Sequence, residues 1–282
     1  MIWWILGVFL KSIESIFRKK SLDESKKITP LAFDFLGSIL GLILWCIFFF
    51  GKIEGNYQYS TTIILLICVW IIFRLSSSYL MQKVYRNEKL STITPYENTN
   101  EMLSIILAFF IFRDVSMTSF CIALAIVVFT IIYTVDFKKL TFPRFFWTFF
   151  TAQILLTLYY VCIGFIVKEI SYIEYFTLEA LLGFIVLLSF TLRQKQTRVI
   201  LSQSKIFYKD RIIAAFLWYV GFILGIYIVS EFWLLLSMIF SFLYVVFTMG
   251  FSFLFFWDIP KLKSIVFAIL ITSFVLLWFY NR

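Results

Sequence analysis

The chain has 282 residues, of which 62% are hydrophobic and only 15% are charged, and its mean hydropathy is +0.96. A polar surface in water cannot cover this much apolar side chain, so the composition excludes an ordinary soluble domain and indicates an integral membrane protein. The net charge of +9 does not imply nucleic acid, because the cations lie in short gaps between apolar runs, where they meet lipid headgroups. We expect membrane lipids as partners and no nucleic acid.

Apolar runs of about 20 residues follow one another along the whole chain, and each is long enough to cross ~30 Å of hydrocarbon as a helix. The predicted spans are 2–20, 31–50, 61–82, 92–112, 117–135, 146–167, 172–192, 212–230, 232–256 and 264–280. The sequence therefore predicts an all-α membrane protein with ten transmembrane helices. Two GxxxG spacings, Gly37 with Gly41 and Gly221 with Gly225, predict close helix packing.

The gaps between these runs are alternately rich and poor in Lys and Arg. Nineteen of the 25 fall in the first, third, fifth, seventh and ninth gaps, against four in the other gaps and at the termini. The nineteen are Arg18, Lys19, Lys20, Lys26, Lys27, Lys83, Arg86, Lys89, Lys138, Lys139, Arg144, Arg193, Lys195, Arg198, Lys205, Lys209, Arg211, Lys261 and Lys263. Cytoplasmic loops are enriched in Lys and Arg, so the pattern predicts a multi-pass cell-membrane protein with both termini on the non-cytoplasmic side.

A short sequence recurs in the two halves of the chain. Residues 110–116 read Phe-Ile-Phe-Arg-Asp-Val-Ser, and residues 254–260 read Leu-Phe-Phe-Trp-Asp-Ile-Pro, an offset of 144 residues. This predicts two repeats of five helices, residues 1–140 and 141–282. Because five is odd, the second repeat is inverted relative to the first, and the exchanged positions of the basic gaps agree. Inverted repeats are typical of transporters that work by alternating access.

Polar residues at helical spacing mark one face of several predicted helices. The predicted substrate-binding residues on these faces are Lys11, Glu14, Arg74, Glu97, Asn100, Glu101, Gln153, Thr157, Tyr160, Ser241 and Tyr244. Charged residues inside a membrane are costly and are usually paired, so they mark candidate functional positions.

Depth along the helices indicates which charges can meet. Arg74 lies about 12 Å from the cytoplasmic end of its helix, Glu97 about 8 Å and Glu101 about 14 Å from that end of the next one. We therefore expect Arg74 to pair with Glu97 or Glu101, and Lys11 to contact Glu14. Such pairs form either a structural lock or gate, or a site for binding and proton exchange. With two cations against three carboxylates, one carboxylate is left to exchange a proton for a cationic substrate, and Glu101 is the expected carrier.

Two five-helix halves, each ending in an apolar helix, a tight turn with one acidic residue (Asp114, Asp258) and a last apolar helix, resemble the drug/metabolite transporter superfamily. The EamA-like ten-helix branch is the most similar. The resemblance covers essentially the whole chain and implies that the polar faces of helices 1, 3, 4, 6 and 9 surround a central cavity. It also implies a secondary transporter of a small polar or amine-bearing solute, with proton coupling as an option.

Two alternatives stay open at this point. One is a flippase for a lipid or lipid-linked sugar, which requires a side opening toward the bilayer. The other is a membrane enzyme or assembly scaffold. The chain has no histidine, the commonest zinc ligand and general base, and no clustered acidic motif, so we expect no enzyme, no metal and no cofactor.

Overall fold

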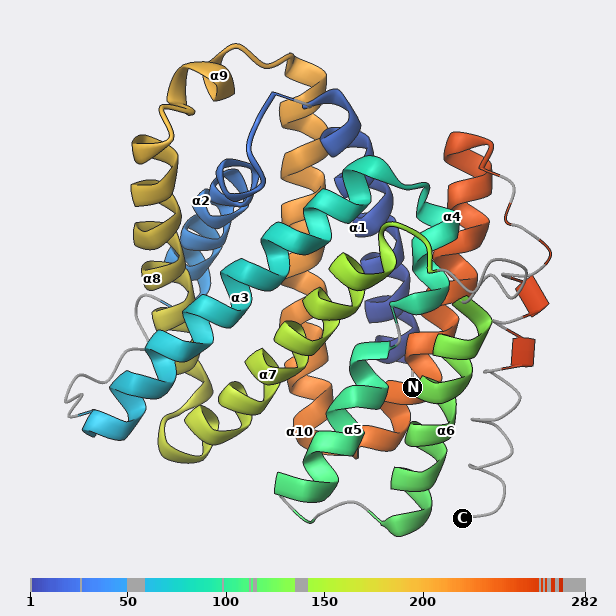
Figure 1. Cartoon of the computed structure of the whole chain (residues 1–282). Helices are drawn as coiled ribbons and strands as arrows, with labels where there is room; N and C mark the ends of the chain where they lie inside the picture. The colour runs from blue at the N-terminus through green and yellow to red at the C-terminus, as the bar shows by residue number, and fades with distance from the viewer. Residues whose placement is uncertain are drawn as a thin grey trace.

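The computed structural model shows a bundle of helices that cross one another at varied tilts (Figure 1). It describes residues 2–25, 27–49, 59–97, 99–111, 113, 116–134, 142–258, 260, 262, 265–266 and 269–270. Within these ranges the side chains of residues 2–5, 48–49, 95, 99–101, 108, 119, 133–134, 172 and 222–243 are not described. The described residues contain no β-strand, as the sequence predicts.

The elements follow the predicted order. They are α1 (Ile2–Glu24), α2 (Pro30–Phe49), α3 (Thr61–Asn87), α4 (Leu90–Ile93), η2 (Thr94–Tyr96), α5 (Thr99–Ile111), α6 (Met117–Thr134), α7 (Phe146–Glu169), α8 (Tyr172–Arg193), α9 (Thr197–Leu201) and α10 (Lys205–Phe256). Serine caps begin several of them, because a serine oxygen accepts from the otherwise unpaired backbone N–H groups of the first turn. Ser60 caps α3, Ser204 caps α10, and Ser171 forms a capping box with Glu174 at α8.

Four helices in the described part of the chain are long and apolar enough to cross a membrane. They are Pro30–Ile47, Thr61–Asn87, Phe146–Glu169 and Ile173–Arg193. Shorter apolar helices are Met102–Ile111, Phe120–Ile132 and Tyr244–Phe256. These helices indicate a protein embedded in a membrane. The predicted tenth span, 264–280, lies almost wholly outside the described residues.

The predicted fourth span is broken near its start. Residues 92–112 were expected as one helix, but the chain forms the short α4, one turn of 3₁₀ helix at η2, and then α5. Pro95 lies in the 3₁₀ turn. Its ring carries no N–H and crowds the preceding turn, which explains why an α-helix does not continue through it. Glu97 follows the break, as the C-cap of η2.

The predicted eighth and ninth spans are joined without a loop in α10, which is 52 residues long. A straight helix of that length would extend about 78 Å. However, a Cβ added at Gly221 would lie 3.9 Å from the Gly7 carbonyl oxygen, while Phe247 and Phe251 pack on Phe9, so two distant parts of α10 lie against the same part of α1. The helix therefore folds back on itself between residues 221 and 247, and Figure 1 shows its two arms beside α1.

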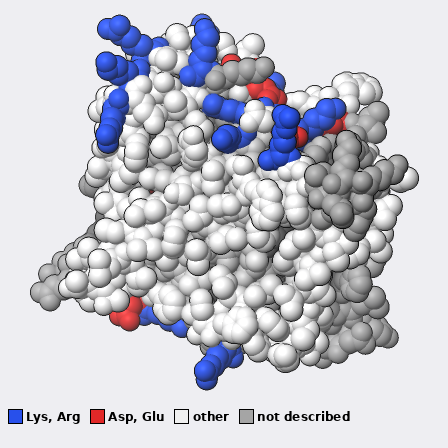
Figure 2. Space-filling model, in the orientation of Figure 1, with Lys and Arg blue, Asp and Glu red and all other residues white. Residues whose placement is uncertain are grey.

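The cation-rich gaps lie together at one end of the bundle. Lys20 Nζ pairs with Asp210 Oδ2 at 2.9 Å, and the Thr29 hydroxyl donates to Gln194 at 2.6 Å, which joins the first gap to the seventh. Lys19 Nζ donates to the Tyr85 carbonyl at 2.6 Å and Lys89 pairs with Asp258 at 3.7 Å, which adds the third gap and the turn after α10. Figure 2 shows most Lys and Arg of the visible face at this end, which we call the cation-rich end. This agrees with the predicted alternation of helix direction.

The packing partners of the first and second halves correspond to one another. α1 lies along both arms of α10, while α7, its predicted counterpart in the second half, lies along α3 and α5. α2 and α8, predicted counterparts, contact each other. The repeated turn also matches in backbone conformation: Arg113 has φ 56° and Trp257 has φ 52°, both left-handed. This conformation at a helix C-terminus normally selects glycine. Lys195, after α8, has it too with φ 53°, so the conformation is not confined to the repeated turn.

We predict that the two ends of the bundle label from opposite sides of the membrane. Ser116 lies at the start of α6 at the cation-poor end, and Ser202 lies between α9 and α10 at the cation-rich end; both are exposed. With the native cysteines replaced, Ser116→Cys should react with a membrane-impermeant maleimide in intact cells. Ser202→Cys should react only after permeabilisation, because positive loops stay inside. Reaction of both in intact cells would refute the topology, and an exchanged pattern would refute its orientation.

Candidate functional site

Arg74 and Glu179 form an ion pair between α3 and α8. Arg74 lies midway along α3, and its Nη1 is 3.2 Å from Oε1 of Glu179 on α8. Glu179 is only 2% exposed, and neither of its carboxylate oxygens accepts a hydrogen bond from the described residues. Gly183, one turn after Glu179, leaves space for the guanidinium, since a Cβ there would be 2.9 Å from Arg74 Nη1. Arg74 thus pairs with Glu179 and not with Glu97, one of its two expected partners; the side chain of Glu101, the other, lies outside those that the structure describes.

Aromatic rings surround this pair. The Trp70 ring lies 5.9 Å from the Arg74 guanidinium carbon, and Trp70 stacks on Tyr159 and meets Tyr175 edge-on. All three rings are buried. A cavity of about 20 Å³ borders Glu179 on its other side, lined also by Trp45 and by Tyr219 of α10. That volume holds about one water molecule, so the site is closed around its own residues.

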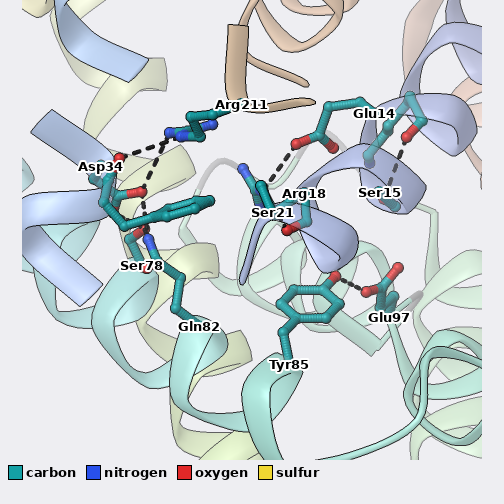
Figure 3. A network of polar contacts seen from close by, with 12 residues as sticks. Glu14, Ser15, Arg18, Ser21, Asp34, Ser78, Gln82, Tyr85, Glu97 and Arg211 are labelled. Atoms are coloured by element: carbon teal, nitrogen blue, oxygen red, sulfur yellow. Dashed lines mark hydrogen bonds and ion pairs between the residues drawn. The ribbon is translucent and has the colours of Figure 1, made fainter. Parts of the chain in front are cut away.

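A second group of charges lies closer to the cation-rich end (Figure 3). We call it the charged layer; it comprises Glu14, Arg18, Asp34, Ser78, Gln82, Tyr85, Glu97 and Arg211. Asp34 of α2 accepts hydrogen bonds from Ser78 and Gln82 of α3 and lies 3.9 Å from Arg211 of α10. Gly37 leaves room for Arg211, because a Cβ at this position would be 2.3 Å from Arg211 Nη2. The layer thus ties three helices together.

Glu14 does not pair with Lys11 as expected. Its carboxylate meets Arg18 Nε at 2.8 Å, one turn along α1, while the Lys11 ammonium lies 4.9 Å from the centre of the Tyr244 ring. Arg18 is on the side of Glu14 toward the cation-rich end, and its fork of donors suits a carboxylate better than the single ammonium of Lys11. Lys11 is instead placed to make a cation–π contact.

Tyr244 connects several of the predicted residues. It is 4% exposed, its hydroxyl lies 2.7 Å from Ser15 Oγ, and it is also within hydrogen-bonding range of Glu97. Glu97 accepts a hydrogen bond from the Tyr85 hydroxyl of α3. Lys11, Glu97 and Tyr244, predicted on three different helices, are therefore brought together.

The other predicted site residues fall into three groups. Gln153 and Thr157 are buried in α7, where the Gln153 amide faces Met81 and the Thr157 hydroxyl donates to the Gln153 carbonyl. Tyr160 is 42% exposed, so it lies on the outer surface; the inward ring of this turn is Tyr159. Helix α7 buries Phe149, Ala152, Tyr159 and Ile166, a face that leaves Tyr160 at its edge. The side chains of Asn100, Glu101 and Ser241 lie outside those that the structure describes.

Three charged residues of these groups were missed from the sequence: Asp34, Glu179 and Arg211. Asp34 is the single acidic residue of the predicted span 31–50. The predicted span 172–192 contains Glu179 in its middle and one other acid, Glu174, near its start. An isolated acid within an apolar run is itself a signal of a functional position. Applied evenly along the chain, that rule would have selected both.

No family model matches the chain, and no curated protein shows significant sequence similarity to it. The resemblance to drug/metabolite transporters therefore stays a prediction. Any inference about function depends on the buried charges themselves.

Proposed function

We propose that this chain is a secondary transporter of the drug/metabolite type, with ten transmembrane helices in two inverted repeats, that carries a small amine-bearing solute. The observation that supports this most directly is the buried Glu179 carboxylate, which has no hydrogen bond among the described residues and is neutralised by Arg74 alone. A buried charge with so few partners costs stability, so it is retained for a purpose other than folding.

The chemistry around Glu179 suits a cation. A carboxylate supplies charge, and the faces of Trp70 and Tyr159 supply the negative potential that attracts ammonium and guanidinium groups. In this structure the guanidinium of Arg74 occupies that position. An amine entering from solvent would replace the Arg74 guanidinium in its contact with Glu179. The Arg74 side chain would then turn away from Glu179.

Two features support alternating access. The packing of α1 along α10 and of α7 along α3 and α5 fits two repeats related by an approximate two-fold axis. The contacts Lys20–Asp210 and Lys89–Asp258, with the charged layer beneath them, close the cation-rich end above Glu179. Opening that end requires these contacts to break.

We predict that amines rescue a variant that lacks Arg74. Arg74→Ala leaves Glu179 without its cation, so alkylguanidines and primary amines should raise its Tm more than they raise that of the wild type. Neutral compounds of the same shape should not. The control is the double variant Arg74→Ala with Glu179→Gln, which has no carboxylate and should show no amine effect. Equal shifts in both variants, or none in Arg74→Ala, would contradict the proposed site.

The flippase alternative needs a polar side opening for a headgroup. The chain has a side opening between α2, α3 and α8, but among the described residues Ser76 and Tyr79 are its only polar lining residues and no charged residue lines it. A polar headgroup would not be stabilised along such a wall. The solute transporter is therefore the better-supported function.

A further inference from the structure

The side opening between α2, α3 and α8 is a groove of about 490 Å³. Its lining residues are Leu31, Ile71, Ile72, Leu75, Ser76, Tyr79, Leu80, Val186 and Phe190. Ile71 to Leu80 spans about 14 Å along α3, close to the thickness of one leaflet of a ~30 Å hydrocarbon core. The groove therefore has the wall and the length that one acyl chain requires.

The groove ends near the cation-rich end of the bundle. Leu31 lies in the first turn of α2, and Phe190 lies in the last turn of α8. Lys83 follows Tyr79 by one helical turn on α3, and Arg193 follows Phe190 by one turn on α8, so each continues the lining face of its helix. Both are exposed, and neither forms an ion pair with the described residues.

The acidic residue of α2 near the groove has partners of its own. Asp34, one turn into α2, is directed toward Ser78, Gln82 and Arg211 in the interior. The rim of the groove thus presents the positive charges of Lys83 and Arg193, while the Asp34 carboxylate is engaged in the interior.

We propose that this groove binds one anionic phospholipid of the cytoplasmic leaflet, with an acyl chain along α3 and the headgroup phosphate between Lys83 and Arg193. The apolar wall selects the chain, and the two cations select the negative headgroup. The site is separate from Glu179, so it stands whether or not amines are transported. A lipid held here ties α3 to α8, the two helices that carry Arg74 and Glu179.

The test is binding of phosphatidylglycerol and phosphatidylcholine with identical chains to the purified full chain, measured by native mass spectrometry in mild detergent. The wild type should retain phosphatidylglycerol preferentially. Lys83→Gln with Arg193→Gln should lower this preference by at least about tenfold, since each cation near the surface contributes a severalfold effect. Ser76→Trp, which fills the groove, should lower retention of both lipids.

The matched control is Lys205→Gln with Lys209→Gln. It removes two exposed cations from the same end of the bundle, but on α10, and should leave the preference unchanged. Equal retention of both lipids by the wild type would overturn the proposal. So would an equal loss in the control, which would indicate surface charge alone, or unchanged retention in Ser76→Trp. A dimer that dissociates with Ser76→Trp would assign the groove to a second copy and also overturn it.

Discussion

Arg74→Ala is expected to lower the free energy of unfolding by about 3–5 kcal/mol, the largest effect of any single substitution considered for this chain. The loss arises because Glu179 is 2% exposed and has no other cation in contact, so removing Arg74 leaves a bare carboxylate in an apolar interior. The measurement is denaturant titration of the purified protein in mild detergent. The comparison is Asp23→Ala, which removes the exposed carboxylate that pairs with Lys19. It should lower the free energy of unfolding by no more than about 1 kcal/mol.

A double substitution separates a structural role of this pair from a functional one. Arg74→Met with Glu179→Leu replaces both charges by apolar groups of similar size, a change that is often neutral or stabilising in buried pairs. We expect this variant to be as stable as the wild type and to lose every response to amines. If the double variant is as unstable as Arg74→Ala, the pair holds the fold together by specific geometry. The argument that it is kept for binding would then fail.

The sequence predicted the positions of charges better than their partners. Arg74 was selected correctly as a cation in an ion pair within a helix, but its partner was sought on the adjacent predicted helix, at Glu97 or Glu101. Neighbours in sequence are neighbours in a simple up-and-down bundle, yet α3 packs along α7, and Gly183 of α8 lies beside Arg74. Its partner in the structure, Glu179, is 105 residues away along the chain. The helical spacing of residues within one segment cannot predict a contact over that separation.

The helical fold and the grouping of the cation-rich gaps could be predicted because both depend on one-dimensional patterns. The length of each apolar run predicts a helix, and the number of Lys and Arg residues in each gap predicts on which side of the membrane it lies. The ion pairs Lys20–Asp210 and Lys89–Asp258 show that cation-rich gaps lie at one end of the bundle. The structure differs from the predicted helices at two places that hydropathy does not indicate. Pro95 interrupts a run that is apolar enough to span, and the return of α10 between residues 221 and 247 occurs without a polar loop.

Gly41→Ala should lower the free energy of unfolding by about 1–3 kcal/mol, although alanine normally stabilises a helix by about 1 kcal/mol relative to glycine. The GxxxG spacing of Gly37 and Gly41 predicted close packing, and the structure shows what is packed there. A Cβ at Gly41 would lie 1.9 Å from Tyr219 Oη and 2.1 Å from its Cζ, so the ring of Tyr219 rests on the α2 backbone. A rigid ring packed against the backbone cannot bend aside as the flexible side chain of a lysine would.

The matched control is Gly250→Ala, on α10, where an added Cβ meets no atom within 4 Å. It should be neutral or stabilise by up to about 1 kcal/mol. Because the clash requires the ring, Gly41→Ala should cost much less in a Tyr219→Ala background, and the double-mutant cycle measures that coupling. Equal effects of Gly41→Ala and Gly250→Ala would show that the contact is soft. Since Tyr219 and Glu179 line the same small cavity, a ring displaced by Gly41→Ala should also weaken the amine response, which links the packing of α2 against α10 to the proposed site.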